Sequence, residues 1–223
     1  MQSIILKFSL AEHAHLCDRM TFFLPAKSPS LEGVASIAVD EITGTRFLYE
    51  RPYADIDSVR GVRVLWPRFA IGDRIYVKET WGYDTDTFET ALENTDFIRY
   101  WGKDAEPCSG WKDPASMPVE AARTFFTVND IKPMRLHEIT EEIALNTGIE
   151  RMGEGFVNYM HLSRFDASVK MQKRAEAWPQ KEMSYETARD SFASMWESYT
   201  RHDMVNTIGW GANPCVWLIA LKK

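Results

Sequence analysis

The chain has 223 residues, of which 45% are hydrophobic and 26% charged, and its formal net charge is −6. This composition is that of an ordinary globular protein and excludes a disordered or fibrous chain. The longest apolar run covers residues 216–221, far short of the ~18 residues that a membrane-spanning helix needs. The first residues lack the charged start and long apolar stretch of a signal peptide. We therefore expect a cytoplasmic protein without a membrane partner.

The charges are unevenly distributed along the chain. Residues 82–106 hold seven acidic and two basic side chains, a local charge of −5. Residues 60–78 hold five basic side chains and one acidic, a local charge of +4. Because a ligand experiences the local field, the acidic total does not exclude a nucleic-acid or phosphate partner. A solvated surface of mixed charge explains the same pattern.

The N-terminal third of the chain is predicted to be mostly strands. Residues 3–8 are rich in β-branched and aromatic side chains, which favours a strand. Ser9 stands three residues before Glu12, the spacing of a capping box, and predicts a helix over residues 10–19. Two strands are expected at residues 34–39 and 45–49, paired as a hairpin around Gly44.

The middle of the chain combines strands with a stretch that has no clear period. Strands are predicted at residues 62–66 and 74–81, the second with the alternation of a half-buried strand. Residues 82–115 are expected to form a long loop or insertion. A strand follows over residues 124–136, with a break at Pro133.

The C-terminal part predicts helices and a buried strand. Thr140 is a suitable N-cap and Gly148 a suitable C-cap for a short helix. Residues 151–182 form a second expected insertion, and a helix is predicted from Ser184 to about residue 199. The chain closes with a strand over residues 215–221. Five to seven short strands with two or three helices predict one α+β domain over residues 1–223.

Motifs of common enzymes are missing from the sequence. It has no Gly-rich phosphate loop, no Gly-x-Ser-x-Gly elbow and no His-Glu-x-x-His pair. The three cysteines, Cys17, Cys108 and Cys215, lie too far apart in sequence for a zinc-binding or redox motif. We therefore expect neither a metal site nor a cofactor.

Three tryptophans are placed at loops or strand ends: Trp81, Trp111 and Trp210. Aromatic rings beside Arg and Lys hold single-stranded nucleic acids, by base stacking next to phosphate pairing. Tryptophans that plug the ends of a small barrel explain this placement equally well.

Several blocks of the sequence carry a family resemblance. They are residues 72–81 (GDRIYVKETW), residues 111–118 (WKDPASMP) and residues 210–217 (WGANPCVW). In this order they resemble the ASCH family of PUA-like barrels, in particular its phage and prophage branch. Residues 139–149 (ITEEIALNTGI) and 192–198 (FASMWES) are similar to further blocks of that branch. The resemblance implies a small β-barrel with flanking helices and a cleft used for RNA, a nucleotide or a modified base.

The catalytic positions of the superfamily differ in this chain. Acetylcytidine amidohydrolases use a Lys, a Thr and a Glu, and the resemblance places Met20, Phe23 and Thr147 at those positions. Since Met and Phe supply neither a nucleophile nor a proton-transfer group, the resemblance implies that this chemistry is absent. Glu79 is a weak catalytic candidate, because an ion pair with a Lys or Arg explains it more simply.

Three hypotheses follow. The first is a non-catalytic ASCH/PUA-like module, phage- or prophage-encoded, that binds nucleic acid (RNA favoured) or a modified nucleotide in a basic, Trp-lined cleft. The second is an interaction protein that engages a host protein through residues 82–106. The third is an amidohydrolase or ribonuclease with a site that the sequence does not reveal. For the first hypothesis, the expected binding residues are Arg60, Arg63, Arg68, Arg74, Lys78, Trp81, Trp111, Lys112, Arg123, Trp210 and Asn213.

Overall fold

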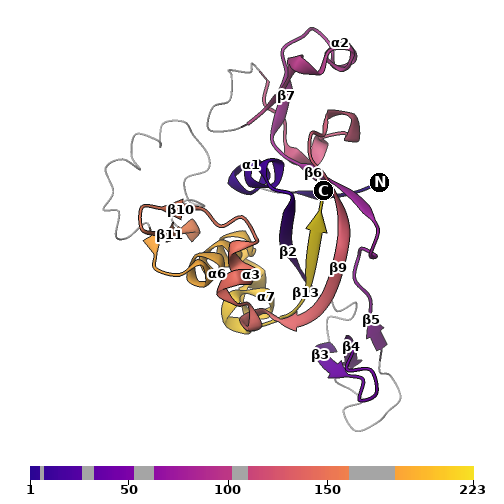
Figure 1. The fold of residues 1–223 in the computed structure, drawn as a ribbon, viewed down its shortest axis with the longest axis vertical. Helices are drawn as coiled ribbons and strands as arrows, with labels where there is room; N and C mark the ends of the chain where they lie inside the picture. The colour runs from indigo at the N-terminus through magenta and orange to yellow at the C-terminus, as the bar shows by residue number, and fades with distance from the viewer. Residues whose placement is uncertain (6–7, 27–32, 53–62, 102–109, 161–183) are drawn as a thin grey trace. The chain divides into compact units, whose positions relative to one another are not determined.

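A computed structural model describes residues 1–5, 8–26, 33–52, 63–101, 110–160 and 184–223 (Figure 1). The chain divides into two compact units that are interleaved in sequence. The first unit comprises residues 1–20, 69–130 and 220–223, and the second comprises residues 21–68 and 131–219. That the whole chain acts as one domain with insertions at about 82–115 and 151–182 stays a prediction.

The largest sheet has five strands in the order β1-β6-β9-β13-β2. Their bounds are β1 Gln2–Ile5, β6 Arg74–Lys78, β9 Phe125–Arg135, β13 Cys215–Lys222 and β2 Arg19–Pro25. Strand β6 runs parallel to β1 and antiparallel to β9. The strand order is open at both ends, so the described strands do not close into a barrel. The α+β class is confirmed, whereas the PUA-like barrel stays a prediction.

Strand β6 organises the core of the first unit. Its predicted alternation holds for Ile75 and Val77, which are fully buried, and for Arg74, which is exposed on the other face. It fails at Tyr76, which is only 8% exposed, because its ring packs beside Phe125 of the neighbouring strand. Ile75 lies opposite Phe126 of β9, which is 1% exposed. Gly72 precedes the strand with φ +91°, a backbone conformation that residues other than glycine rarely adopt.

The N-terminal helix, α1 (Phe8–Leu16), also belongs to the first unit. It ends earlier than predicted, because residues 19–25 form strand β2 instead of the last turn of a helix and a loop. The capping box that Ser9 and Glu12 were expected to form concerns side chains outside the described set.

The expectation of a long loop over residues 82–115 is wrong for most of its described part. This stretch contains β7 (Trp81–Tyr83), α2 (Phe88–Glu93), β8 (Ile98–Tyr100) and two short 3-10 helices, Thr95–Phe97 and Pro114–Ser116. A third 3-10 helix, Val119–Ala121, follows. Each element is too short for a hydrophobic period, so the sequence pattern could not show them. Together they bury a small core of Trp81, Ala91, Ile98, Met117 and Ala121.

The second unit contains the predicted hairpin and most of the helices. Strands β3 (Gly33–Val39) and β4 (Arg46–Pro52) pair around Gly44, whose φ is +69°, and β5 (Arg63–Leu65) joins them. The helical part consists of α3 (Glu141–Leu145), α6 (Ala188–Tyr199), α7 (Val205–Ile208) and 3-10 helices at Leu136–Glu138, His202–Met204 and Trp210–Ala212. A small sheet of β10 (Arg151–Met152), β11 (Gly155–Val157) and β12 (Ser184–Tyr185) completes it.

The two predicted C-terminal helices are confirmed with small shifts. Thr140 caps α3 through its side chain, as expected, but the C-cap is Asn146 rather than Gly148, which follows two residues later with φ +88°. The longer helix α6 is capped by Thr187 rather than by Ser184, because Ser184 is a residue of strand β12. Within the described part of the chain, no helix is both long and apolar enough to cross a membrane.

Candidate nucleic-acid interface

The face of β6 that carries Arg74 and Lys78 combines these cations with aromatic rings, of which Tyr76 is buried. Arg74 is exposed and its Cζ lies 5.2 Å from the ring centroid of Phe125, on the neighbouring strand. Lys78 Nζ lies 5.8 Å from the ring centroid of Tyr76 and donates a hydrogen bond to the Ala115 carbonyl at 2.8 Å. Tyr76 and Phe125 are cross-strand partners with ring centroids 6.5 Å apart. The pattern that predicted a strand here also places two predicted binding residues, Arg74 and Lys78, on one face.

Lys112 is brought close to this region by the backbone. Trp81 and Lys112 form an isolated antiparallel bridge, in which Lys112 N donates to Trp81 O at 2.8 Å. The Lys112 ammonium lies 5.0 Å from the ring centroid of Tyr83. Two of the sequence blocks on which the family resemblance rests, residues 72–81 and 111–118, are therefore in direct contact.

The predicted tryptophans of the first unit differ in accessibility. Trp81 is only 4% exposed, its indole N–H donates to Ser116 Oγ at 3.3 Å, and its ring packs against Phe88 at 5.2 Å. It is therefore a core residue, and stacking on a base would require the ring to be uncovered. Trp111 is half-buried and packs edge-on against Trp101, with centroids 5.1 Å apart. Trp101 was not predicted from the sequence, because it lies in the stretch without a hydrophobic period.

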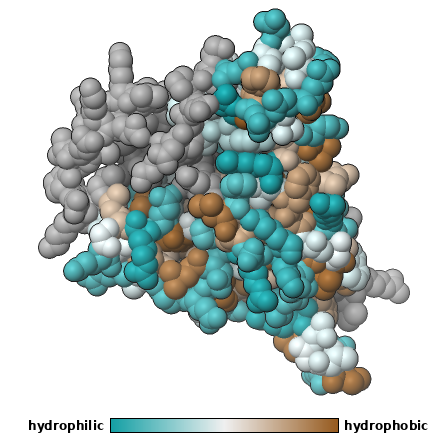
Figure 2. All heavy atoms as spheres, turned by 45° about the horizontal axis from the view of Figure 1, so that its top comes forward, coloured by the Kyte–Doolittle hydropathy of each residue, from teal (hydrophilic) through white to brown (hydrophobic). Residues whose placement is uncertain are grey.

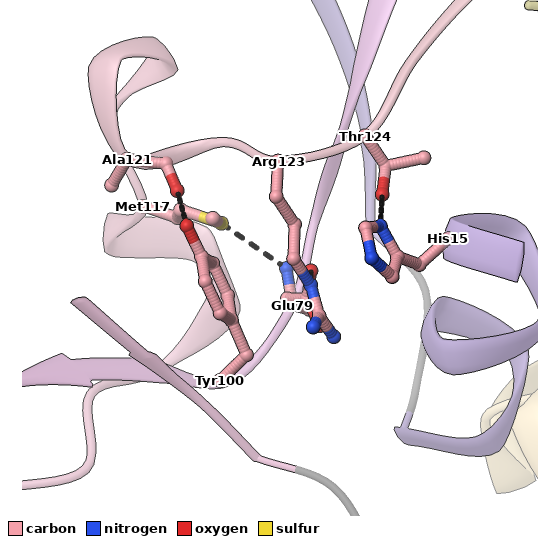
Figure 3. Close-up of polar contacts among 7 residues, drawn as sticks. All are labelled: His15, Glu79, Tyr100, Met117, Ala121, Arg123 and Thr124. Atoms are coloured by element: carbon pink, nitrogen blue, oxygen red, sulfur yellow. Dashed lines mark hydrogen bonds and ion pairs between the residues drawn. The ribbon is translucent and has the colours of Figure 1, made fainter. Parts of the chain in front are cut away.

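An ion pair between Glu79 and Arg123 lies at the end of β6 (Figure 3). Arg123 donates to both carboxylate oxygens of Glu79, from Nε to Oε1 at 2.9 Å and from Nη2 to Oε2 at 2.7 Å. The side chain of Glu79 is 2% exposed and that of Arg123 is 26% exposed. The expectation that Glu79 forms an ion pair with a Lys or Arg is confirmed.

Neighbouring side chains hold this ion pair in place. The guanidinium carbon of Arg123 lies 4.2 Å from the ring centroid of Tyr100. The Tyr100 hydroxyl donates to the Ala121 carbonyl at 2.8 Å, and burial raises the pKa of Tyr100 to about 12. The backbone N–H of Glu79 donates to Met117 Sδ at 3.4 Å. The phenol therefore stays neutral at physiological pH and offers its ring face to Arg123.

His15 of α1 lies on the other side of the ion pair in the view of Figure 3. Its Nδ1 is hydrogen-bonded to Thr124 Oγ1 at 3.2 Å, and its carbonyl accepts a hydrogen bond from Lys223 Nζ. Burial, and then the positive charges of Arg123 and Lys223, lower the pKa of His15. The ring is therefore neutral at pH 7.

The cluster does not have the arrangement of a hydrolase centre. Both oxygens of Glu79 are occupied by Arg123, and Thr124, the hydroxyl beside His15, is 1% exposed. Among the described residues, no three or more His, Cys, Asp or Glu side chains come together in a way that could hold a metal ion.

The remaining predicted binding residues belong to the second unit or lie outside the described set. Arg60 and the side chain of Arg63 are not described, and Arg68 is exposed. Trp210 is half-buried, with the Arg189 guanidinium 5.2 Å from one ring centroid and the His137 ring 4.7 Å away. Asn213 has φ 46° and accepts a hydrogen bond from the His137 backbone N–H at 2.8 Å. That these residues converge with those of the first unit on a single cleft stays a prediction.

The positions that the resemblance assigns to lost catalytic groups are buried. Met20 is 2% exposed, Phe23 is 9% exposed with its ring 5.2 Å from that of Phe192, and Thr147 is 3% exposed. The Thr147 hydroxyl donates to the Ala144 carbonyl at 2.6 Å, at the end of α3. All three side chains have packing or capping roles.

The acidic stretch is partly folded. Asp84 pairs with Arg99 at 3.1 Å, whereas the side chains of Asp86, Glu89, Glu93 and Asp96 are exposed around α2. On the face drawn in Figure 2, hydrophobic and hydrophilic residues are interspersed. Binding of a host protein through this stretch stays a prediction.

No family model matches the chain, and searches of curated proteins and of solved structures gave no match.

Proposed function

We propose that this chain is a nucleic-acid-binding module, with single-stranded RNA favoured, and that the first unit carries the binding residues. One observation supports the proposal most. Four cations expected to bind nucleic acid each lie over an aromatic ring, and the rings belong to Phe125, Tyr76, Tyr83 and Tyr100. Tyr76 is buried, but Phe125, Tyr83 and Tyr100 are partly exposed, so three of the pairs place positive charge for phosphates next to rings that bases can contact, the combination used for single strands.

Cation–aromatic pairs also stabilise proteins that bind no ligand. A cation without a carboxylate partner is the better candidate for binding a ligand. Arg123 is neutralised by Glu79. Arg74, Lys78 and Lys112, in contrast, form no ion pair with a carboxylate in the described residues. A protein that used these cations only for its own stability would gain from acidic partners near them. Three cations without an ion pair among the described residues, in a chain of net charge −6, favour an anionic ligand.

The proposal retains the resemblance to the ASCH family, with its PUA-like barrel, its phage or prophage branch and a cytoplasmic location. What supports it is the contact between residues 72–81 and 111–118, two blocks separated in sequence that meet at the Trp81–Lys112 bridge. Residues of both blocks, Arg74, Lys78 and Lys112, belong to the proposed surface. A free modified nucleotide is the smaller ligand that the same surface would take.

The test is fluorescence anisotropy with labelled single-stranded RNA, single-stranded DNA and duplex DNA, each titrated at low and moderate salt. The double variant Arg74→Ala/Lys78→Ala should bind single-stranded RNA more weakly. Each phosphate contact on a single strand contributes about 0.7 to the slope of log K against log salt, so the slope should fall by about 1.4. Far-UV circular dichroism checks that the variant is folded.

The matched control is Arg151→Ala/Lys222→Ala, which removes one arginine and one lysine from other exposed positions. Arg151 also lies over an aromatic ring, 4.9 Å from the centroid of Phe156, but in the second unit. The control should leave the slope within error of wild type. Equal slopes for both double variants, or no binding of any of the three nucleic acids at low salt, would overturn the proposal.

A further inference from the structure

The Arg123 guanidinium has one donor edge in use and one edge available. A guanidinium carries two bidentate donor edges, one formed by Nε and one Nη and the other by both Nη groups. Glu79 occupies the first edge, since it accepts from Nε at 2.9 Å and from Nη2 at 2.7 Å. No described residue accepts a hydrogen bond from Nη1, so the second edge keeps two parallel donors.

The orientation of this second edge is fixed by its surroundings. The side chain of Glu79 is 2% exposed, so a rotation of Arg123 away from it would leave a buried carboxylate unpaired. The Tyr100 ring covers one face of the guanidinium at 4.2 Å, and Tyr100 is held in turn by its hydrogen bond to Ala121. Figure 3 shows Arg123 in this position between Tyr100 and His15. The Arg123 side chain is 26% exposed, so part of it is open to a ligand.

The chemistry of the edge favours a neutral planar acceptor over an isolated phosphate. The Glu79–Arg123 pair has no net charge, so it attracts a phosphate less than Arg74, Lys78 or Lys112 does. Two parallel donors in one plane match two parallel acceptors in one plane. Of the two purines, only guanine presents two acceptors side by side, O6 and N7, whereas adenine presents a donor and an acceptor on the same edge.

We propose that the second edge of Arg123 reads a guanine base, with its two Nη groups donating to O6 and N7. This inference rests on the proposed function, since the guanine belongs to the single-stranded RNA held by the surrounding cations. Arg123 is then the specificity-determining residue of the surface, Glu79 and Tyr100 position it, and Arg74, Lys78 and Lys112 contact phosphates. The ion pair with the buried Glu79 therefore holds the second edge of Arg123 in position for guanine, in addition to stabilising the fold.

The test uses the unmodified protein and oligouridine probes that differ in one central base. Guanine should bind about tenfold more tightly than adenine, within the range that one bidentate pair provides. Hypoxanthine keeps both O6 and N7 and should bind like guanine. 7-Deazaguanine lacks N7 and should lose most of the preference. Because the probes change and the protein does not, a folding defect cannot imitate this pattern.

A protein variant gives a second readout. Arg123→Lys keeps the positive charge and a partner for Glu79, but lacks the planar pair of donors. It should bind the guanine and adenine probes with equal affinity and retain the salt slope of wild type. A purely structural role for Arg123 would instead change the affinity for both probes by the same factor.

Three outcomes overturn the inference, and they are distinguishable. Measurable but equal affinities for guanine, adenine and 7-deazaguanine overturn the reading of guanine and leave the proposed function standing. Tighter binding of a 5′-phosphorylated oligouridine, together with no preference for the central base, would mean that Arg123 contacts a phosphate. No binding of any probe at low salt overturns both proposals together.

Discussion

Removal of Arg123 should destabilise the protein far more than removal of an ordinary surface arginine. The variant Arg123→Met takes away both hydrogen bonds to Glu79 and the contact with Tyr100. It leaves a carboxylate with a 2% exposed side chain and no described partner. The physical cost is that of an unpaired charge in a place that water reaches poorly.

The size of this effect follows from the burial of the two partners. Breaking a buried ion pair costs about 3–5 kcal/mol, whereas an exposed pair contributes about 0.2–1 kcal/mol. Glu79 is at the buried limit, but Arg123 is 26% exposed, so water can enter part of the space that it vacates. We therefore expect a loss of about 3 kcal/mol, at the lower end of the buried range.

Urea unfolding, followed by both far-UV circular dichroism and tryptophan fluorescence, measures the loss. Coincident transitions by the two probes are needed before a single free energy is assigned. With m of about 3 kcal/mol/M, the midpoint should fall by about 1 M. The double variant Arg123→Met/Glu79→Leu should recover most of the loss, because replacing a buried pair by apolar side chains is often nearly neutral.

Two results would refute this reasoning. A loss below about 1 kcal/mol for Arg123→Met would mean that the pair behaves as an exposed salt bridge. A double variant no more stable than Arg123→Met would mean that the unpaired carboxylate is not the source of the loss.

Three further predictions concern pH. The pKa of Tyr100 is raised from 10.0 to about 12, so its contribution to stability is present below pH 10 and is lost as pH rises toward 12. Tyr100→Phe should remove this loss from alkaline unfolding curves, and an unchanged decline would contradict the prediction. The hydrogen bond from Arg46 lowers the pKa of Glu138 from 4.5. Both side chains of this pair are 41% exposed, and exposed pairs contribute little, so Arg46→Ala should lower the stability by at most about 1 kcal/mol at neutral pH. This difference should shrink as pH falls from 4.5 through the lowered pKa of folded Glu138 and vanish below that pKa, and a difference that persists in strong acid would contradict the assignment. Burial and nearby cations lower the pKa of His15 from 6.5, so the stability given by its neutral ring is lost as pH falls below that value. NMR titration should show a midpoint below 6.5 that rises in Lys223→Ala and stays in place in Lys222→Ala.

Local patterns in the sequence predict much of the fold. The alternation of residues 74–78, the glycine at position 44 and the cap at Thr140 each depend on neighbours a few residues away. The last two are confirmed, and the alternation holds except at Tyr76, which is buried. Strand β2 was missed, because its burial does not alternate cleanly and the preceding helix signal extends into it. The elements between residues 81 and 122 were missed since each is only a few residues long.

The contacts within the candidate site depend on segments far apart in sequence, which local patterns do not predict. The sequence predicts that Glu79 pairs with a cation, but the identity of Arg123 depends on how β6 and the segment before β9 come together, 44 positions apart. Trp81 was expected on a surface because it ends a strand, whereas Phe88 and the small core around Ala91 bury it. Contacts across such separations are set by tertiary packing, which a single sequence does not record.

The interleaving of the two units determines the order in which the ribosome can deliver them. Residues 131–219 complete the second unit, and only afterwards do residues 220–223 supply the last segment of the first. At about 5–20 residues per second, these 89 residues take on the order of ten seconds to make. During that time Asp18 still lacks the Lys223 backbone N–H, which donates to its carbonyl at 3.0 Å. The unit that carries the proposed RNA-binding residues therefore receives its last segment only after the second unit is complete.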